Sequence, residues 1–229
     1  MKALSLTHLI RPPVAGANAA NARPPLLLLL HGVGSNEQSM SRLAPAFDPR
    51  FLVVSARSPI TLGPNSFAWF HVTFTAQGPM IDFNEAKVGW THLAHFIDEV
   101  IEAYSADPAR VFIVGFSQGG IMALAALLTA PEQIAGVAMM SGRLLPEVIP
   151  YAAEPARLRD KPLLIVHGIS DEKLGIHFAR SAREQLARFS LALTYRELAM
   201  GHAVSEESIA AVAAWLSARL DEPAPGAEA

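Results

Sequence analysis

Six short apolar runs, each bounded by turn residues, constrain the fold of this 229-residue chain more than any other feature of its sequence. Brief runs that are β-branched or leucine-rich are typical of buried strands. Because the runs are largely unbroken rather than alternating, they favour a parallel sheet that is covered on both faces. The runs are Leu26–Leu30, Phe51–Ser55, Val111–Phe116, Gly136–Met140, Leu163–Val166 and Leu191–Glu197.

Helical patterns fill the stretches between these runs. Strand and helix therefore alternate along the chain, which predicts a doubly wound α/β fold with a mostly parallel central sheet and helices on both faces. Residues 3–10 are a candidate for an additional antiparallel strand at one edge. The expected helices are Glu37–Ala46, Asn84–Tyr104, Gln118–Thr129, Gly175–Arg188 and Ser205–Leu220.

The chain shows no internal repeat and no linker that would divide it, so we expect a single domain over residues 1–221. Residues 222–229 contain only Pro, Ala, Gly and Glu and are expected to form a disordered tail. Residues 57–83 show no clear period although they hold many apolar side chains. We expect them to form a long loop that is packed down or functional.

Composition excludes several classes of protein. A net charge of -3 without a run of Lys or Arg argues against a nucleic-acid binder, which needs a basic patch to displace counterions. The absence of cysteine excludes disulfide scaffolds, Cys-ligated metals and a thiol nucleophile. The leucine run Leu26–Leu30 is far shorter than the ~20 residues that span a bilayer. With no secretory signal recognised either, we expect a cytoplasmic protein without a membrane span.

The segment Gly115-Phe116-Ser117-Gln118-Gly119 has the pattern G-x-S-x-G, with a predicted strand before it and a predicted helix after it. That setting is the one a nucleophile elbow requires. The two glycines lack the Cβ that would clash in so sharp a turn. The helix N-terminus behind the serine offers free amides to a developing oxyanion. The segment therefore predicts a nucleophilic serine at position 117 rather than a serine that only caps a helix.

A serine hydroxyl needs a general base in contact with it, and the chain has eight histidines. His202 is the best candidate because it follows the last predicted strand and stands beside Gly201 in a predicted loop. His31 and His167 each precede a glycine at a strand end, where a histidine more often shapes the loop by hydrogen bonding. The other five histidines have no supporting context.

The base in turn needs a carboxylate that fixes its tautomer. Asp171 lies just beyond the strand Leu163–Val166, at the carboxyl edge of the predicted sheet. Asp160 precedes that strand and would lie at the opposite edge, while Glu172 is the alternative to its neighbour. The chain order serine, aspartate, histidine is the order expected of an α/β-hydrolase.

The rest of an oxyanion hole is expected in the loop after an early strand. The segment Leu30-His31-Gly32-Val33-Gly34 follows the leucine run and has this place. We therefore predict the backbone N–H groups of Val33 and Gln118 as the oxyanion donors. The rival interpretation, a phosphate-binding loop, is disfavoured because the chain has neither G-x-G-x-x-G nor GK[ST].

These segments together resemble the phospholipase/carboxylesterase family, which includes bacterial carboxylesterases and acyl-protein thioesterases. The resemblance implies an α/β-hydrolase fold with little or no cap domain, no cofactor and no metal, and it assigns nucleophile, acid and base to Ser117, Asp171 and His202. The matching segments are Leu30–Gly34, Ala56–Ile60, Ala68–Phe70, Gly115–Gly120, Met140–Gly142, His167–Gly168 with Asp171, and Gly201–His202.

The function expected from the resemblance is hydrolysis of a small-molecule carboxylic ester, with a short- to medium-chain acyl group, through an acyl-enzyme on Ser117. Alternatives are an acyl-protein thioesterase, a lysophospholipase, a peptidase, or a binding protein that keeps the fold without catalysis. Residues of the 57–83 segment are expected to contact the acyl group, or else to pack that segment onto the core. The candidates are Trp69, Phe70, Phe74 and Met80. The resemblance leaves open a homodimer.

Two positions depart from the family pattern. His71 stands where the family often has aspartate after Trp-Phe, so the resemblance assigns no role to that position. Lys173-Leu174-Gly175 replaces a segment that often reads Val-Pro, which affects the loop around Asp171. Neither departure changes the expected nucleophile, acid and base.

Overall fold

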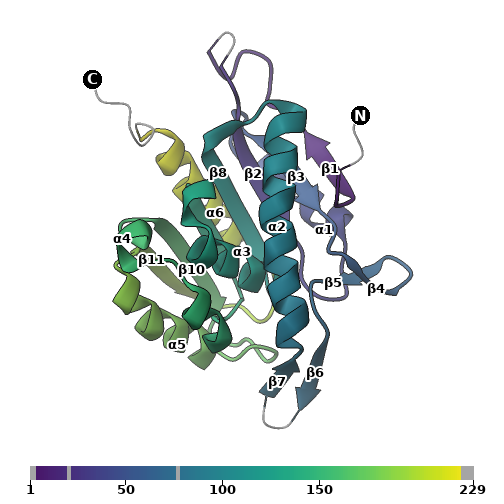
Figure 1. The fold of residues 1–229 in the computed structure, drawn as a ribbon, viewed down its shortest axis with the longest axis vertical. Helices are drawn as coiled ribbons and strands as arrows, with labels where there is room; N and C mark the ends of the chain where they lie inside the picture. The colour runs from purple at the N-terminus through teal and green to yellow at the C-terminus, as the bar shows by residue number, and fades with distance from the viewer. Residues whose placement is uncertain (1–3, 20–21, 76–77, 223–229) are drawn as a thin grey trace.

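A seven-stranded sheet lies at the centre of the computed structural model, which describes residues 4–19, 22–75 and 78–222 (Figure 1). The strands lie in the order β1-β3-β2-β8-β9-β10-β11, and each neighbouring pair is parallel except β1 with β3. The six predicted runs form the parallel strands. The antiparallel edge strand expected within residues 3–10 is present as β1, which is shorter and lies over His8–Arg11. The strands are β1 His8–Arg11, β2 Pro25–Leu30, β3 Leu52–Ala56, β8 Asp107–Phe116, β9 Gly136–Met140, β10 Pro162–Gly168 and β11 Ala192–Leu198.

The leucines of β2 show why unbroken apolar strands suit this sheet. Leu26, Leu28 and Leu30 belong to one core cluster, while Leu27 and Leu29 belong to the other. All five side chains are fully buried. Since successive side chains of a strand point to opposite faces, a strand buried on both faces has no position for a polar residue.

Helices cover both faces of the sheet, as predicted. Residues of α2, α3, α4 and α5 pack into the first core cluster, and residues of α1 and α6 pack into the second. In Figure 1 the long helix α2 crosses in front of the sheet. This arrangement confirms the predicted fold class. The helices are α1 Glu37–Ser41, α2 Phe83–Tyr104, α3 Gln118–Thr129, α4 Pro155–Leu158, α5 His177–Leu186 and α6 Glu206–Leu220.

The expectation of a loop without regular structure over residues 57–83 is wrong, because this segment contains two antiparallel β-hairpins. The first turns through Asn65, which adopts a positive φ of 54°. The strands are too short for a two-residue alternation to be visible in the sequence. They are β4 Ile60–Gly63, β5 Ser66–Ala68, β6 Val72–Thr75 and β7 Gly78–Ile81.

The expected helix Glu37–Ala46 is shorter than predicted. It begins as α1, where the Asn36 side chain accepts hydrogen bonds from the Gln38 and Ser39 N–H groups, and ends at Ser41. A separate 3₁₀ turn follows at Ala44–Ala46, with a proline in its first turn. Proline has no N–H to donate, so it starts a new turn rather than extending the α-helix.

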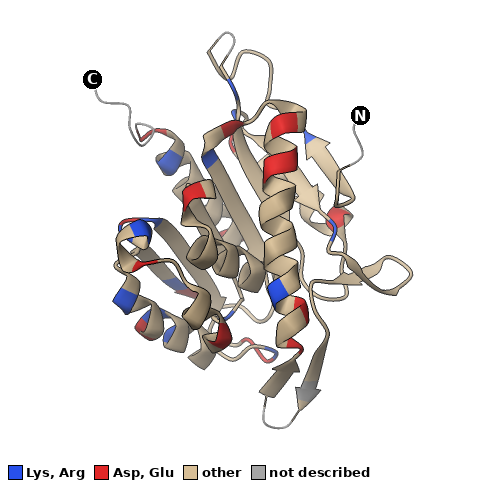
Figure 2. Ribbon diagram, in the orientation of Figure 1, with Lys and Arg blue, Asp and Glu red and all other residues tan. Residues whose placement is uncertain are grey.

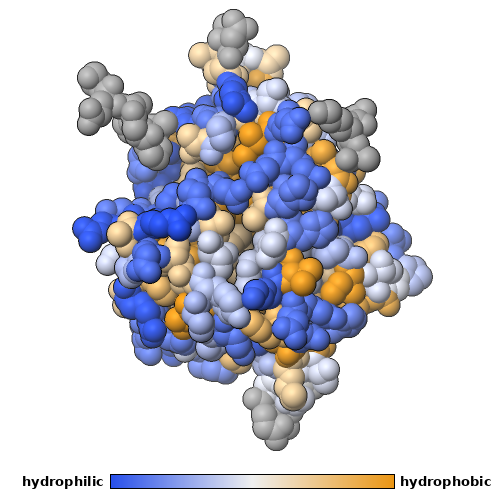
Figure 3. Space-filling view, in the orientation of Figure 1, coloured by the Kyte–Doolittle hydropathy of each residue, from blue (hydrophilic) through white to orange (hydrophobic). Residues whose placement is uncertain are grey.

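The surface carries charges of both signs. Acidic and basic residues are interspersed along the elements drawn in Figure 2, and the face seen in Figure 3 is mostly hydrophilic with small separate hydrophobic patches. None of the helices in the described part of the chain combines the length and hydropathy needed to span a bilayer. Most of the expected tail, residues 223–229, lies outside the described residues.

Candidate active site

Ser117 stands alone between a strand and a helix, since β8 ends at Phe116 and α3 begins at Gln118. Its backbone has φ 53° and ψ -117°, a conformation that side-chain-bearing residues rarely adopt. Such strain costs about 1–3 kcal/mol and persists only where the surrounding structure enforces it. The residue is 7% exposed, so the sharp turn places a nearly buried hydroxyl at the carboxyl edge of the sheet.

The two glycines around Ser117 are required by backbone contacts. A Cβ on Gly115 would lie 2.2 Å from the Gly119 carbonyl oxygen, and a Cβ on Gly119 would lie 2.2 Å from the Leu30 carbonyl oxygen. Neither neighbour is a movable side chain. The glycines thus let strand β8, helix α3 and the end of β2 pass within contact distance of one another.

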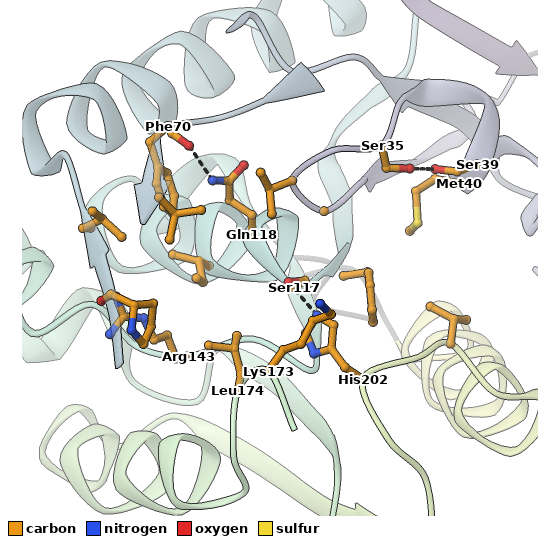
Figure 4. A pocket seen from close by; sticks show the side chains of 18 of the residues that line it. Ser35, Ser39, Met40, Phe70, Ser117, Gln118, Arg143, Lys173, Leu174 and His202 are labelled. Atoms are coloured by element: carbon orange, nitrogen blue, oxygen red, sulfur yellow. Dashed lines mark hydrogen bonds between the residues drawn. The ribbon is translucent and has the colours of Figure 1, made fainter. Parts of the chain in front are cut away.

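His202 and Asp171 complete a line of hydrogen bonds to Ser117. His202 Nε2 lies 3.0 Å from Ser117 Oγ, and His202 Nδ1 lies 2.7 Å from Asp171 Oδ2 (Figure 4 shows the first bond). Since a carboxylate only accepts hydrogen bonds, Nδ1 carries the proton of the neutral ring and Nε2 is free to accept from the serine hydroxyl. The structure therefore brings together the three residues predicted as nucleophile, base and acid.

The carboxylate of Asp171 is held from several sides. Its Oδ1 accepts hydrogen bonds from the backbone N–H groups of Lys173 and Leu174, at 2.9 Å and 2.8 Å. Its Oδ2 also lies 3.3 Å from Nε2 of the buried His167, which donates to the Leu174 carbonyl at 2.6 Å. Burial lowers the pKa of His167, which favours the neutral ring, so this second histidine places an N–H rather than a positive charge beside the carboxylate.

The loop after β2 runs directly against Ser117. A Cβ on Gly32 would lie 3.2 Å from Ser117 Cβ. The buried His31 shapes this loop: its Nε2 accepts from the Ser58 N–H at 3.1 Å, so its Nδ1 donates to the Gly32 carbonyl at 2.8 Å. This is the loop-shaping role predicted for His31. Val33 is the next residue of this loop.

The two predicted oxyanion donors both line the cavity beside Ser117. Within the described residues, neither the Val33 N–H nor the Gln118 N–H donates to another group of the protein. The side chain of Gln118 has a separate task, because it accepts from the Trp69 N–H and donates to the Phe70 carbonyl, both at 2.7 Å. It thereby ties the residue after Ser117 to the segment between the two hairpins.

Ser117 opens onto a cavity of about 370 Å³. One part of its lining comes from the loops at the carboxyl ends of the central strands, and another from the second hairpin, β6–β7 (Figure 4). The apolar side chains of the lining are Val33, Met40, Leu43, Phe70, Val72, Pro79, Ile81, Phe116, Ile121, Leu174 and Val204.

The four residues expected to contact an acyl group are placed differently. Phe70 lines the cavity. Trp69 is 1% exposed and packs in the core cluster beneath helices α2 and α3 instead. Met80 is 65% exposed and does not line the cavity. The side chain of Phe74 lies outside the described part of the structure.

Sequence reasoning missed several residues of the lining. Val72 and Ile81 face each other across the second hairpin and both reach the cavity. Arg143 also lines it, one residue beyond the segment Met140–Gly142 that carried part of the resemblance. His71, the departure from the family pattern, lies instead on the exposed side, with Nδ1 2.9 Å from the Glu85 carboxylate.

This geometry can activate an oxygen nucleophile. The Ser117 hydroxyl is hydrogen-bonded to an imidazole, and the imidazole is hydrogen-bonded to a buried carboxylate. This arrangement lets a serine attack a carbonyl at neutral pH. Among the described residues, no group of three His, Asp or Glu side chains is placed to hold a metal ion. The arrangement of Ser117, His202 and Asp171 is one that can carry out acyl transfer by serine.

Comparison with known proteins agrees with the fold and the motifs. The sequence profile described as phospholipase/carboxylesterase matches residues 15–220. The chain is 26% identical over 212 residues to the carboxylesterase SOBER1 of Arabidopsis thaliana, covering 85% of this chain and 90% of that protein. It is 28% identical over 237 residues to acyl-protein thioesterase 1 of Neurospora crassa, covering 90% and 96%. The solved carboxylesterase of Bacillus cereus superposes with a TM-score of 0.79 at 21% identity, covering 94% and 95%, which shows a shared fold.

Proposed function

The chain belongs to the phospholipase/carboxylesterase family, and from that premise we propose that it is a serine carboxylesterase that forms an acyl-enzyme on Ser117. The observation that carries the proposal is the unbroken line of hydrogen bonds from Ser117 through His202 to Asp171, at 3.0 Å and 2.7 Å. Ser117 lies at a cavity with a mostly apolar lining, which is suited to an acyl chain.

In the proposed acylation step, His202 acts first as a base and then as an acid. His202 Nε2 takes the Ser117 proton as Oγ bonds to the ester carbonyl carbon, and Asp171 stabilises the imidazolium through Nδ1. The backbone N–H groups of Val33 and Gln118 receive the negative charge that develops on the carbonyl oxygen. When the bond to the alcohol breaks, the imidazolium gives its proton to the departing oxygen.

Deacylation repeats these steps with water. His202 takes a proton from a water molecule as its oxygen attacks the acyl carbon, and returns that proton to Ser117 Oγ as the acid leaves. The cavity of about 370 Å³ is at the small end of the range for binding pockets, which supports a short- to medium-chain acyl group. The same machinery would cleave a thioester, so an acyl-protein thioesterase is the second candidate.

The test is hydrolysis of 4-nitrophenyl esters from acetate to dodecanoate by the wild-type protein and Ser117→Ala. We expect an optimum at short or medium length, and a loss of at least about 10⁴-fold in kcat for the variant. Ser181→Ala, on the exposed side of α5, is the matched control and should keep wild-type activity. Equal turnover by Ser117→Ala would exclude Ser117 as the nucleophile.

A second experiment separates an enzyme from a binding protein. A fluorophosphonate should add covalently to Ser117, because the hydroxyl is activated by His202. Intact-mass analysis would show one adduct on the wild-type protein and none on Ser117→Ala. An unreactive wild-type protein that binds esters without turnover would support the non-catalytic alternative.

A further inference from the structure

Arg143 reaches the cavity from a backbone segment that is fixed against Ser117. The Ser117 N–H donates to the Met140 carbonyl at 2.8 Å, and the Ser141 N–H donates to the Val166 carbonyl at 2.9 Å. A Cβ on Gly142 would lie 3.3 Å from the Ser117 carbonyl oxygen. The residue that follows Gly142 is therefore held at a set place relative to the nucleophile.

The guanidinium of Arg143 has few partners within the protein. Its Nη2 donates to the Pro79 carbonyl at 3.4 Å, a long bond, and its Cζ lies 5.4 Å from the centre of the Phe178 ring. Among the described residues, no carboxylate lies within salt-bridge distance of it. Because a guanidinium carries five N–H donors, most of its hydrogen-bonding capacity is left for a ligand.

The Arg and Lys side chains that line the cavity are both cationic. Arg143 and Lys173 line it, and the described lining contains no Asp or Glu. Burial lowers the pKa of Arg143, and the charge of nearby Glu147 offsets this only in part. A cation partly withdrawn from water is stabilised by an anion in direct contact with it. Glu147 acts on Arg143 only through its charge, and no described carboxylate forms an ion pair with the guanidinium.

We propose that Arg143 binds an anionic oxygen group, a carboxylate or a phosphate, carried by the ester substrate. The inference rests on the proposed function, which places the scissile carbonyl at Ser117. The substrate would then extend from Ser117 toward the β6–β7 hairpin, where the guanidinium meets Pro79. A planar guanidinium can hold either group through two parallel hydrogen bonds. If Arg143 only connects its loop to the hairpin, Arg143→Met should change kcat/KM equally for anionic and neutral esters.

The first experiment uses pairs of esters that differ in charge. For a carboxylate on the acyl side, mono-4-nitrophenyl adipate is compared with 4-nitrophenyl hexanoate. For a phosphate on the alcohol side, 2-(hexanoyloxy)ethyl phosphate is compared with 2-(hexanoyloxy)ethanol. The measured quantity is the ratio of kcat/KM for the anionic ester to that for its neutral partner. We expect Arg143→Met to lower this ratio by about 10–100-fold for at least one pair.

Two further variants make the result specific. Arg143→Lys keeps the charge but not the fork of donors, so it should restore part of the ratio. Arg188→Met removes the same charge from an exposed position outside the cavity and should leave both ratios unchanged. Ratios that are equal in the wild-type protein and Arg143→Met, for both pairs, would overturn the inference.

A binding measurement distinguishes this failure from a failure of the proposed function. The protein with Ser117→Ala cannot turn over the esters by the proposed route, so calorimetry can give Kd for mono-4-nitrophenyl adipate and for the phosphate ester. Adding Arg143→Met should weaken the binding of at least one of them by about 10–100-fold. If the wild-type protein hydrolyses the esters but Arg143→Met changes neither the kcat/KM ratios nor Kd, the protein is an esterase without an anion site. If Arg143→Met weakens binding but the wild-type protein hydrolyses no ester, the anion site exists and the proposed function is wrong.

Discussion

The two sides of the cavity differ in how strictly their structure limits the residues that can form them. The reactive side consists of the Gly32–Val33 loop, Ser117 and His202, with Asp171 bonded to His202 from behind, and each part follows the carboxyl end of a parallel strand. The hairpin side consists of Phe70, Val72, Pro79 and Ile81, which lie on or beside two small hairpins outside the central sheet. The reactive side needs particular residue types at fixed backbone positions, whereas the hairpin side needs only apolar surface.

This difference explains which structural constraints can be recognised in the sequence. Gly115 and Gly119 are required because another residue would collide with backbone atoms at 2.2 Å. On the hairpin side, many side chains would fill the same space, since apolar packing is tolerant of substitution. We therefore expect substitutions on the reactive side to have large effects, and those on the hairpin side to change chiefly which ester is bound.

The largest effect is expected for Asp171→Asn on the reactive side. The Lys173 and Leu174 N–H groups would hold the amide oxygen, so the amide NH₂ would face His202 Nδ1. The ring would then carry its proton on Nε2 and could not accept one from Ser117. We expect kcat to fall about 10⁴-fold with little change in the circular dichroism spectrum.

The neighbouring carboxylate provides a control for this prediction. Glu172 is exposed, and Glu172→Gln should keep wild-type kcat because it removes a charge without touching the line of hydrogen bonds. A large loss in Glu172→Gln with near-normal activity in Asp171→Asn would mean that the acid is Glu172.

Gly119→Ala tests the backbone constraint itself. Its Cβ would have to displace the Leu30 carbonyl, so we expect a loss of about 3 kcal/mol or more in the free energy of unfolding, measured by denaturant titration. Gly63→Ala is the matched control, since a Cβ there meets nothing within 4 Å, and its effect should stay within about 0.5 kcal/mol. Similar losses in both variants would contradict the role given to the close approach.

The hairpin side was harder to predict because the register between β6 and β7 decides which side chains face the cavity. In β7, Met80 and Ile81 are adjacent and so point to opposite faces of the hairpin. The pairing of Val72 with Ile81 and of Thr73 with Met80 decides which face meets the cavity. A shift of one residue would exchange the two, and a segment this short does not reveal its register. This is why Ile81 was missed and Met80 was selected.

The reactive side was predictable because the topology carries most of the information. A parallel strand brings the residue after its end to the same edge as its neighbours, so Ser117, Asp171 and His202 were expected at one edge before any distance was known. Arg143 also follows such a strand, but a lone arginine carries no spacing or glycine pattern that marks it. Its place became evident only from its position in the cavity.

Gln118→Leu tests the bond between the two sides. The substitution leaves the buried Trp69 N–H and Phe70 carbonyl without partners, which should cost about 2 kcal/mol in the free energy of unfolding. Since Phe70 lines the cavity, we also expect KM for neutral esters to rise more than kcat falls. Gln185→Leu breaks only an exposed bond to Ser181 and should change neither quantity. A kcat loss with unchanged KM would mean that Gln118 serves the reactive side alone.

The smallest effect concerns the pH dependence of stability, through the buried histidine that shapes the reactive side. Burial lowers the pKa of His31, so below about pH 6.5 the unfolded chain binds a proton that the native state does not. Stability should therefore be full above pH 6.5 and fall as the pH drops, by at most about 1.4 kcal/mol per pH unit for this group. Protonation would also deprive the Ser58 N–H of its acceptor.

His31→Gln isolates this contribution, because a glutamine amide can accept from the Ser58 N–H and donate to the Gly32 carbonyl without titrating. Urea unfolding between pH 5 and 7 should give a shallower decline for the variant than for the wild-type protein, whatever their difference at pH 7. Burial lowers the pKa of His167 as well, so part of the decline should remain. Parallel declines in the two proteins would mean that His31 binds its proton equally well in the native and unfolded states, and that the loop beside Ser117 tolerates a charged imidazole.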